Sequence, residues 1–96
     1  MGTRRAAVES HSDEIRAIAA RHRALSVFIF GSVARGDDGP DSDIDFLVEF
    51  DHGASLLDLM RIEDDLESLL GCQVDVVSVG GLKERDEHIR REAVPV

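Results

Sequence analysis

The segment SDIDFLVEF, residues 42–50, alternates polar and apolar side chains, and this alternation constrains the fold more than any other feature of the chain. Successive side chains of a β-strand point to opposite faces of a sheet. The segment therefore predicts a strand with one apolar face and one face that begins acidic. The apolar face holds Ile44, Phe46, Val48 and Phe50, and the other face holds Asp43, Asp45, Leu47 and Glu49. Aspartate is uncommon in strands, so the acidic face needs an explanation.

Two further apolar runs predict strands. ALSVFIF, residues 24–30, is a run rich in β-branched and aromatic residues, which is typical of a central strand buried on both faces, and Gly31 ends it. CQVDVVSV, residues 72–79, predicts a third strand in which Asp75 interrupts a run of valines. The turn-forming residues of GDDGPD, residues 36–41, predict a loop before the acidic strand.

The N-terminal region predicts a helix. Ser10 or Ser12 can cap a helix that runs to about His22, and a start nearer Thr3 is also compatible with the pattern. The apolar positions of this helix lie on one side, so we expect it to cover a sheet.

A second helix is predicted between Ser55, which forms a capping box with Asp58, and Gly71. A third, highly charged helix is predicted over residues 82–93, with Leu82 and Ile89 as its apolar anchors. The apolar side of the second helix is expected to comprise Leu56, Leu59, Met60, Leu66 and Leu70.

The order of these elements predicts the α/β (α+β) class, with a small mixed β-sheet and helices packed on one face. The 96 residues suffice for one domain, so we expect a single domain over 1–96. The N-terminus lacks the apolar core of a signal peptide, and no apolar run is long enough to span a membrane. Cys72, the single cysteine, cannot form an internal disulfide. We therefore expect a cytoplasmic protein without a membrane partner.

The formal net charge of −9 argues against direct binding of nucleic acid and favours a basic protein partner. Arginines gather locally at Arg4/Arg5, Arg21/Arg23 and Arg90/Arg91. Such pairs more often belong to solvated helix faces than to binding patches, so we expect the former.

Three familiar motifs come close to the acidic segment, and each fails at a named residue. GSVARG matches the start of G-x-x-x-x-G-K-[ST], but Asp37 and Asp38 stand where a lysine and a hydroxyl are required. DSDIDF matches the start of an EF-hand loop, but Phe46 replaces its turn glycine and His52 its closing glutamate. Ser32 lacks the G-x-S-x-G frame of a hydrolase nucleophile.

The remaining interpretation is a metal-assisted phosphate site. Asp43 and Asp45 project the same way from a strand, and Asp75 can join them if the two strands are neighbours. Carboxylates suit Mg²⁺, which binds a few of them together with substrate phosphates, and two such ions can clamp a phosphoryl displacement. Gly31 and Ser32 lie where a strand turns, so their N–H groups and the Ser32 hydroxyl can hold phosphate oxygens.

These residues carry a resemblance to a known family. Gly31-Ser32, ten intervening residues, Asp43-x-Asp45 and a later aspartate on a strand resemble the nucleotidyltransferase superfamily of DNA polymerase beta. Within it, GSVARGDDGPDSDIDFLV and VDVVS are similar to the minimal nucleotidyltransferases, which are often antitoxin partners of HEPN-domain toxins. The resemblance covers residues 10–95 and implies the polymerase-beta-like nucleotidyltransferase fold.

The resemblance implies roles for the matching positions. Asp43 and Asp45 would be paired metal ligands, and Asp75 would bind metal or help deprotonate the incoming hydroxyl. Gly31 and Ser32 would hold the triphosphate of the nucleotide.

The same resemblance implies roles for two more residues. Arg35 would pair with a phosphate, with an ordinary salt bridge to Asp37 or Asp38 as an equal alternative. Ser42 matches the family's SDxD pattern and is expected to order the loop rather than to react.

The activity implied is Mg²⁺-dependent transfer of a nucleoside monophosphate to a hydroxyl. For the minimal antitoxin type this means AMP from ATP, with two Mg²⁺ ions, onto a tyrosine of a partner HEPN toxin in a hetero-oligomer. A non-catalytic protein that neutralises its partner by occlusion remains an alternative, as does a nucleotide sensor. The acidic set argues for catalysis, because occlusion alone does not require three clustered carboxylates.

Overall fold

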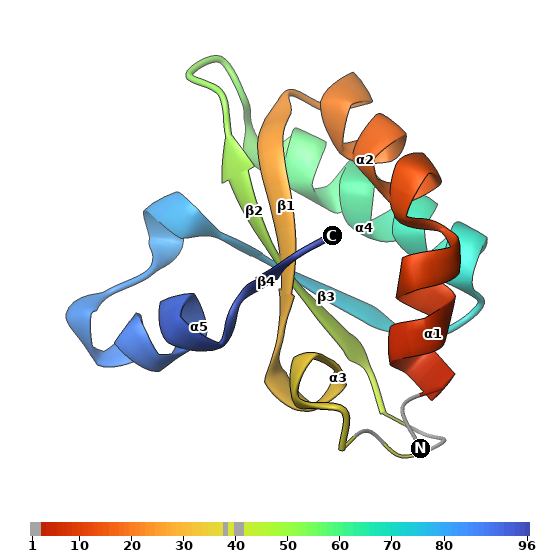
Figure 1. Ribbon diagram of the computed structural model, residues 1–96. Helices are drawn as coiled ribbons and strands as arrows, with labels where there is room; N and C mark the ends of the chain where they lie inside the picture. Colours follow the sequence, from red (N-terminus) through yellow and green to blue (C-terminus); the bar gives the residue numbers. More distant parts are fainter. Residues whose placement is uncertain (1–2, 38, 40–41) are drawn as a thin grey trace.

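The computed structural model describes residues 3–37, 39 and 42–96. Within these residues, four strands form one mixed sheet in the order β3-β2-β1-β4 (Figure 1). β1 (Ala24–Phe30) pairs antiparallel with β2 (Ile44–Phe50) and with β4 (Val94–Pro95), and β2 pairs parallel with β3 (Val74–Ser78). The three predicted strands are present, two of them with shorter bounds than predicted.

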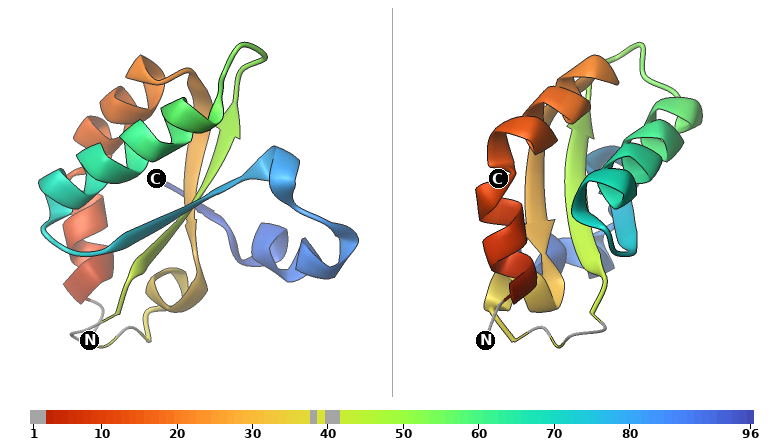
Figure 2. Two further views of the ribbon diagram at one scale, coloured as in Figure 1. Left: turned by 180° about the vertical axis from the view of Figure 1, so that it is seen from behind. Right: turned by 90° about the vertical axis from the view of Figure 1, so that its right-hand side faces the viewer.

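Helices α1 (Thr3–Ser10), α2 (Ser12–Arg21) and α4 (Leu56–Leu70) lie on one face of this sheet (Figure 2). α2 packs against β1 and α4 against β3, and the two helices also contact each other. The predicted class, a small mixed sheet with helices on one face, is confirmed.

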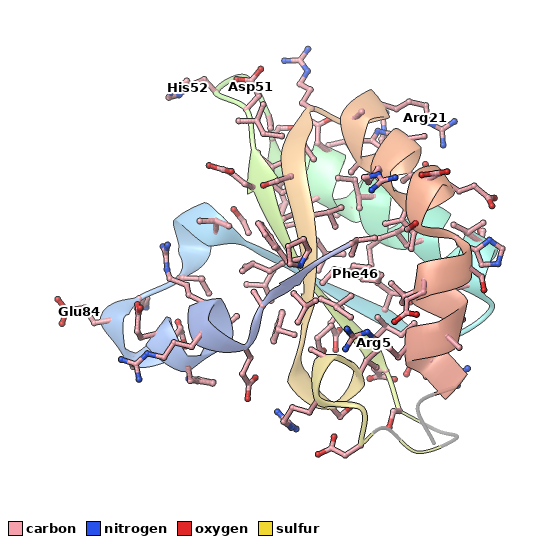
Figure 3. All side chains as sticks on the ribbon, in the orientation of Figure 1. Arg5, Arg21, Phe46, Asp51, His52 and Glu84 are labelled. Carbon is pink, nitrogen blue, oxygen red and sulfur yellow. The ribbon has the colours of Figure 1, made fainter. Side chains whose placement is uncertain are left out.

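The core lies between the sheet and these helices. Phe46, Ile44 and Val48 are fully buried, as the alternation in β2 predicts, and Figure 3 shows Phe46 in the interior. The helices contribute Ile15 of α2 and Ile62 of α4, both also fully buried. Leu47 points to the opposite face but is only 3% exposed, because the C-terminal part of the chain covers it.

The prediction that β1 is buried on both faces is wrong. Val27 and Ile29 are buried, and Phe28 between them is only partly buried. Leu25, which an irregularity in the register between Ala24 and Ser26 turns away from the core, is 64% exposed. Helices α1, α2 and α4 cover a single face of the sheet, so along the regular part of β1 only alternate residues enter the core between sheet and helices. A continuous apolar run therefore did not indicate burial on both faces.

The N-terminal helix begins at Thr3, which is the earlier of the predicted starts, but it is two helices rather than one. The chain departs from helical geometry at His11, between α1 and α2. Val8 of α1 is buried in the same core as Ile15 of α2.

α4 begins with the predicted capping box, in which the N–H of Ser55 donates to Asp58 Oδ2 at 2.9 Å, and it ends at Gly71 with a φ of 71°. The predicted apolar side is partly wrong, because Leu56 and Met60 are 72% and 53% exposed. The buried side is centred on Ile62 and Leu66. At about 100° per residue, Met60 lies about 120° around the helix from Leu66.

The helix predicted over residues 82–93 is present only in its second half. The chain forms two 3₁₀ turns, η1 (Val79–Gly81) and η2 (Glu84–Asp86), before a short helix α5 (Glu87–Glu92). The Asp86 side chain accepts a hydrogen bond from the Lys83 N–H at 3.0 Å, which favours a local turn over a longer helix. β4 was not predicted, because two residues are too few for an alternation.

None of the helices in the described part of the chain combines the length and apolar character that crossing a membrane requires. Cys72 is a half-buried free thiol that packs against the core.

Candidate active site

The register of the sheet brings the predicted aspartates together. Asp45 of β2 is paired with Phe30 at the end of β1 on one side and with Asp75 of β3 on the other. Asp43 comes directly before β2, two residues from Asp45. This end of the sheet lies next to α3 (Gly31–Arg35), whereas Asp51 and His52 mark the opposite end of β2 (Figure 3).

Gly31 packs directly against the Asp45 carboxylate. Its φ is 74°, in the region that favours glycine, and a Cβ at this position would lie 2.5 Å from Asp45 Oδ2. The turn from β1 into the short helix α3 therefore lies in contact with the acidic cluster. The turn at Gly31, directly after the strand, agrees with the sequence-based prediction.

The electrostatics of the site reflect this crowding. The pKa of Asp45 is raised above its ordinary value, first by burial of the carboxylate and then by the negative charges of Asp75 and Asp43. Arg35 acts in the opposite direction and lowers the pKa of Asp45. Asp75 and Asp43 are thus close enough for their charges to act on Asp45.

Ser42 has the loop-ordering contacts expected of it. Its Oγ accepts a hydrogen bond from the Gly39 N–H at 2.7 Å, and its own N–H donates to the Gly39 carbonyl at 3.1 Å. This turn leads directly into Asp43.

Arg35 makes a salt bridge that was one of its two predicted roles. Its Nε donates to Asp37 Oδ2 at 3.2 Å, and its Nη1 donates to Glu92 Oε1 of α5 at 2.9 Å. These hydrogen bonds, the one to Asp37 first, raise the pKa of Arg35. Glu92 was not identified from the sequence, since nothing in a 57-residue separation marks it as a partner. The other predicted partner, Asp38, lies outside the described residues.

The expectation that Arg4 and Arg5 lie on a solvated helix face is wrong. Arg4 Nε donates to the Ser42 carbonyl at 3.2 Å, and Arg5 Nη1 donates to the Ala34 carbonyl at 2.7 Å. Both bonds are partly buried and join α1 to segments that flank the acidic cluster. Because their acceptors are backbone atoms 38 and 29 residues away, no sequence pattern signals them.

The donor chemistry of the cluster suits Mg²⁺, although the side chains do not form a complete cage. No group of three or more His, Cys, Asp or Glu side chains in the described part of the chain is gathered to hold a metal ion. Mg²⁺, however, usually binds through one or two carboxylates and completes its shell with phosphates and water. The half-buried Asp45 beside Asp75 and Asp43 offers such carboxylates, and a cation would offset the repulsion that raises the pKa of Asp45.

This fold and this arrangement of aspartates are those that the resemblance to the nucleotidyltransferases implies. A family model described as a nucleotidyltransferase domain matches residues 12–94, so the chain belongs to this family. The resemblance found in the sequence is confirmed, and the match leaves α1 outside the family domain.

Two relatives indicate which group of nucleotidyltransferases the chain resembles. A Methanocaldococcus jannaschii protein, provisionally named a protein adenylyltransferase, is 46% identical over 80 residues, which cover 79% of this chain and 83% of the relative. The protein adenylyltransferase MntA of Thermococcus cleftensis is 40% identical over 74 residues, which cover 77% of this chain and 72% of MntA. The chain is thus similar to MntA-like minimal nucleotidyltransferases.

Solved structures support the same fold. One described provisionally as a minimal nucleotidyltransferase has a TM-score of 0.84 at 46% identity and covers 93% of this chain and 92% of its own. A chain from a toxin-antitoxin complex with AMP-PNP has a TM-score of 0.74 at 19% identity, with 86% of this chain and 69% of that chain covered. At that identity the second likeness shows the fold alone.

The contact between Gly31 and Asp45 can be tested with two alanine variants. Gly31→Ala and Gly36→Ala share the backbone strain of a positive φ, but only the first places a Cβ against Asp45, because nothing lies within 4 Å of a Cβ at Gly36. We expect both to lose more than about 1 kcal/mol of stability, and Gly31→Ala to lose more than Gly36→Ala because its Cβ also meets Asp45 Oδ2. Only Gly31→Ala should also lose nucleotidyl transfer, measured per folded molecule. Equal activity of the two variants would contradict a functional contact.

The raised pKa of Asp45 gives a pH dependence of stability. The folded protein holds a proton at Asp45 more tightly than the unfolded chain, so this contribution to stability is full below the ordinary carboxyl pKa of about 3.9 and is lost as the pH rises through the raised value. At pH 7 the charged carboxylate is therefore destabilising in the metal-free protein. We expect Asp45→Asn to raise the Tm at pH 7, with a gain that shrinks toward pH 4.

The control for this thermal measurement is Asp64→Asn. Asp64 is an exposed aspartate of α4, so this variant removes the same charge from a protein of net charge −9 without touching the cluster. A gain in Tm for Asp64→Asn as large as that for Asp45→Asn would mean that the overall charge, and not the cluster, sets the stability.

Proposed function

We propose that this chain is a protein adenylyltransferase that moves AMP from ATP to a hydroxyl of a partner protein, with a tyrosine of a HEPN-type toxin as the acceptor. The observation that carries the proposal is the register of the sheet, which aligns Asp45 with Asp75 and places Gly31 against the Asp45 carboxylate. The relatives named as protein adenylyltransferases support the choice of a protein acceptor. The related fold, crystallised with AMP-PNP in a toxin-antitoxin complex, supports ATP as the nucleotide and a toxin as the partner.

In this proposal, Gly31 and Ser32 hold the triphosphate through backbone N–H groups and the Ser32 hydroxyl, and Gly31 permits close approach. The acceptor oxygen forms a bond to the α-phosphorus while the bond from that phosphorus to the bridging oxygen breaks, so pyrophosphate leaves. Asp75, which is exposed at the edge of the cluster, accepts the acceptor's proton or holds a water molecule that does.

Mg²⁺ bound with the nucleotide would neutralise the phosphate charge and stabilise the charge that develops on the attacking and leaving oxygens. Asp43 and Asp45 would be its paired carboxylate ligands, and Asp75 would complete the set. Burial of the carboxylate, and then the negative charges of Asp75 and Asp43, disfavour the charged form of Asp45, so cation binding at this place offsets a penalty that the fold creates.

Arg35 has a secondary place in this scheme. Its guanidinium is engaged by Asp37 and Glu92, yet it is close enough to Asp45 to lower the pKa of that carboxyl. It therefore contributes positive potential to the site, and a direct bond to a phosphate would require it to exchange one of its carboxylate partners.

Occlusion of the partner is the second candidate function, and one observation favours it. The first turns of α4 expose three large apolar side chains, Leu56, Leu57 and Met60, among acidic residues. Such a surface suits a protein partner with apolar and basic side chains. Binding and catalysis are compatible, so the test must separate them.

The test is label transfer to a purified HEPN-type partner, or to an extract of the host, from ATP labelled on the α-phosphate. We expect a labelled protein band with the unmodified chain and a loss of more than about 100-fold with Asp43→Asn. Asp64→Asn is the matched control and should transfer label normally.

The two candidates give different results when binding and neutralisation of the partner are measured beside label transfer. An Asp43→Asn variant that still binds and neutralises the partner as well as the unmodified chain would favour occlusion. Label that comes only from the γ-phosphate would contradict nucleotidyl transfer, because it would show a kinase reaction.

A further inference from the structure

We infer that Arg4 and Arg5 of α1 are positioning residues that hold the two segments of the active site, Gly31–Arg35 and Ser42–Asp43, at a fixed separation. The inference rests on the proposed function, because it assigns these segments to the nucleotide and to the aspartate ligands. It concerns residues outside the matched family domain, which begins at residue 12.

Arg5 holds the first segment. Its Nη1 donates to the Ala34 carbonyl at 2.7 Å, and its Nε donates to Glu9 Oε1 one turn along α1 at 3.1 Å. Carbonyls in the last turn of a helix lack an N–H partner within the helix, and Ala34 lies in the last turn of α3. Arg5 supplies that donor, and Figure 3 shows its side chain reaching from α1 toward α3.

Arg4 holds the second segment. Its Nε donates to the Ser42 carbonyl at 3.2 Å, at the residue that directly precedes Asp43. Ser42 is also fixed by two hydrogen bonds to Gly39, which precedes it in the chain. The position of Asp43 therefore depends both on β2, which follows it, and on the hydrogen bond from Arg4.

The two bonds come from adjacent residues on one helix, and this is why they act together. α1 packs against α2 and α3, and its Val8 is only 2% exposed in the core. A helix anchored in the core carries two guanidinium groups to the two sides of the acidic cluster. Guanidinium donors suit this task because they are planar and always charged.

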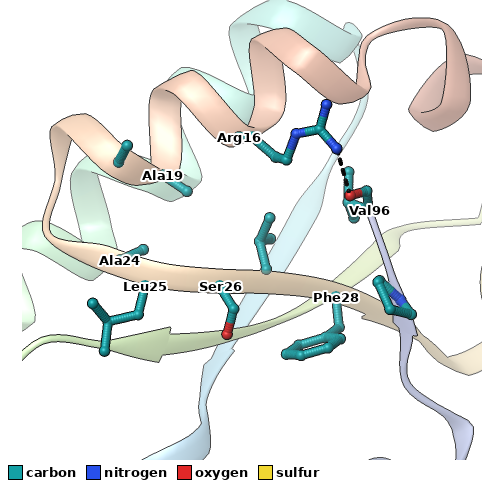
Figure 4. A pocket seen from close by; sticks show the side chains of 10 residues that line it. Arg16, Ala19, Ala24, Leu25, Ser26, Phe28 and Val96 are labelled. Atoms are coloured by element: carbon teal, nitrogen blue, oxygen red, sulfur yellow. Dashed lines mark hydrogen bonds between the residues drawn. The ribbon is translucent and has the colours of Figure 1, made fainter.

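The structure offers a matched control in α2. Arg16 Nη1 also donates to a backbone oxygen, that of Val96, at 3.3 Å, although this bond is exposed whereas those of Arg4 and Arg5 are partly buried (Figure 4). This bond lies beside a groove between α2 and β1, and the residues that line the groove include Ala20, Leu25 and Phe28 but none of the aspartates of the site. Arg16→Ala removes a comparable contact without touching the active site.

The experiment compares Arg4→Ala, Arg5→Ala and Arg16→Ala with the unmodified chain, and each rate is normalised to the folded fraction. We expect Arg5→Ala mainly to raise the KM for ATP and Arg4→Ala mainly to lower kcat, each by about 10-fold, as for other residues that orient ligands indirectly. Arg4→Lys and Arg5→Lys should restore part of the loss, since lysine can still donate to a carbonyl. Arg16→Ala should leave both constants unchanged.

Hydrogen exchange supplies a readout that does not depend on activity. The amide protons of Gly39 and Ser42 form the turn before Asp43, and we expect them to exchange faster in Arg4→Ala but not in Arg16→Ala. If the unmodified chain transferred no label, the proposed function would fail. The exchange result would still test whether Arg4 fixes the segment before Asp43. Variants of Arg4 and Arg5 that lower only the Tm, with kcat, KM and exchange like those of Arg16→Ala, would overturn the inference.

Discussion

The parallel pairing of β2 with β3 places Asp45 beside Asp75, and the rest of the site depends on this one juxtaposition. Folding brings like charges together on partly buried strands, which is unfavourable unless a proton or a cation neutralises them. The core stabilises the arrangement, because Ile44, Phe46 and Val74 on the opposite side of the same strands are buried against the helices. Burial of the apolar face of the sheet thus offsets the repulsion between the aspartates on the other face.

Elements around the cluster support the aspartates and the segments that flank them. Gly31 brings a turn against the Asp45 carboxylate where any side chain would collide with it. Arg35 adds a positive charge nearby and joins α3 to α5 through Glu92. Arg4 and Arg5 connect both flanks of the cluster to α1. A small domain can therefore hold three carboxylates near one another with supports contributed from both ends of the chain.

The sequence predicted the parts of this fold that follow from local periodicity and from turn chemistry. The alternation around Asp45, the capping box at Ser55 and the stop at Gly71 are all present in the structure. The sequence could not predict features set by tertiary geometry. Leu56 and Met60 look like core residues by composition, but the rotation of α4 on the sheet exposes them. β4 exists only because Val94 and Pro95 lie beside β1, and the contacts of Arg4 and Arg5 are to backbone carbonyls far along the chain.

The central claim is that Asp43, Asp45 and Asp75 bind a divalent cation together with a nucleotide. The most direct measurement is a titration of Mn²⁺ followed by electron paramagnetic resonance, in the presence of a non-hydrolysable ATP analogue. It should compare the unmodified chain with Asp45→Asn, Asp75→Asn and the control Asp64→Asn. We expect a ternary complex in the unmodified chain and in Asp64→Asn, weakened at least about 10-fold by either change within the cluster. Equal Mn²⁺ and nucleotide binding in all four proteins would contradict the claim that these carboxylates form the site.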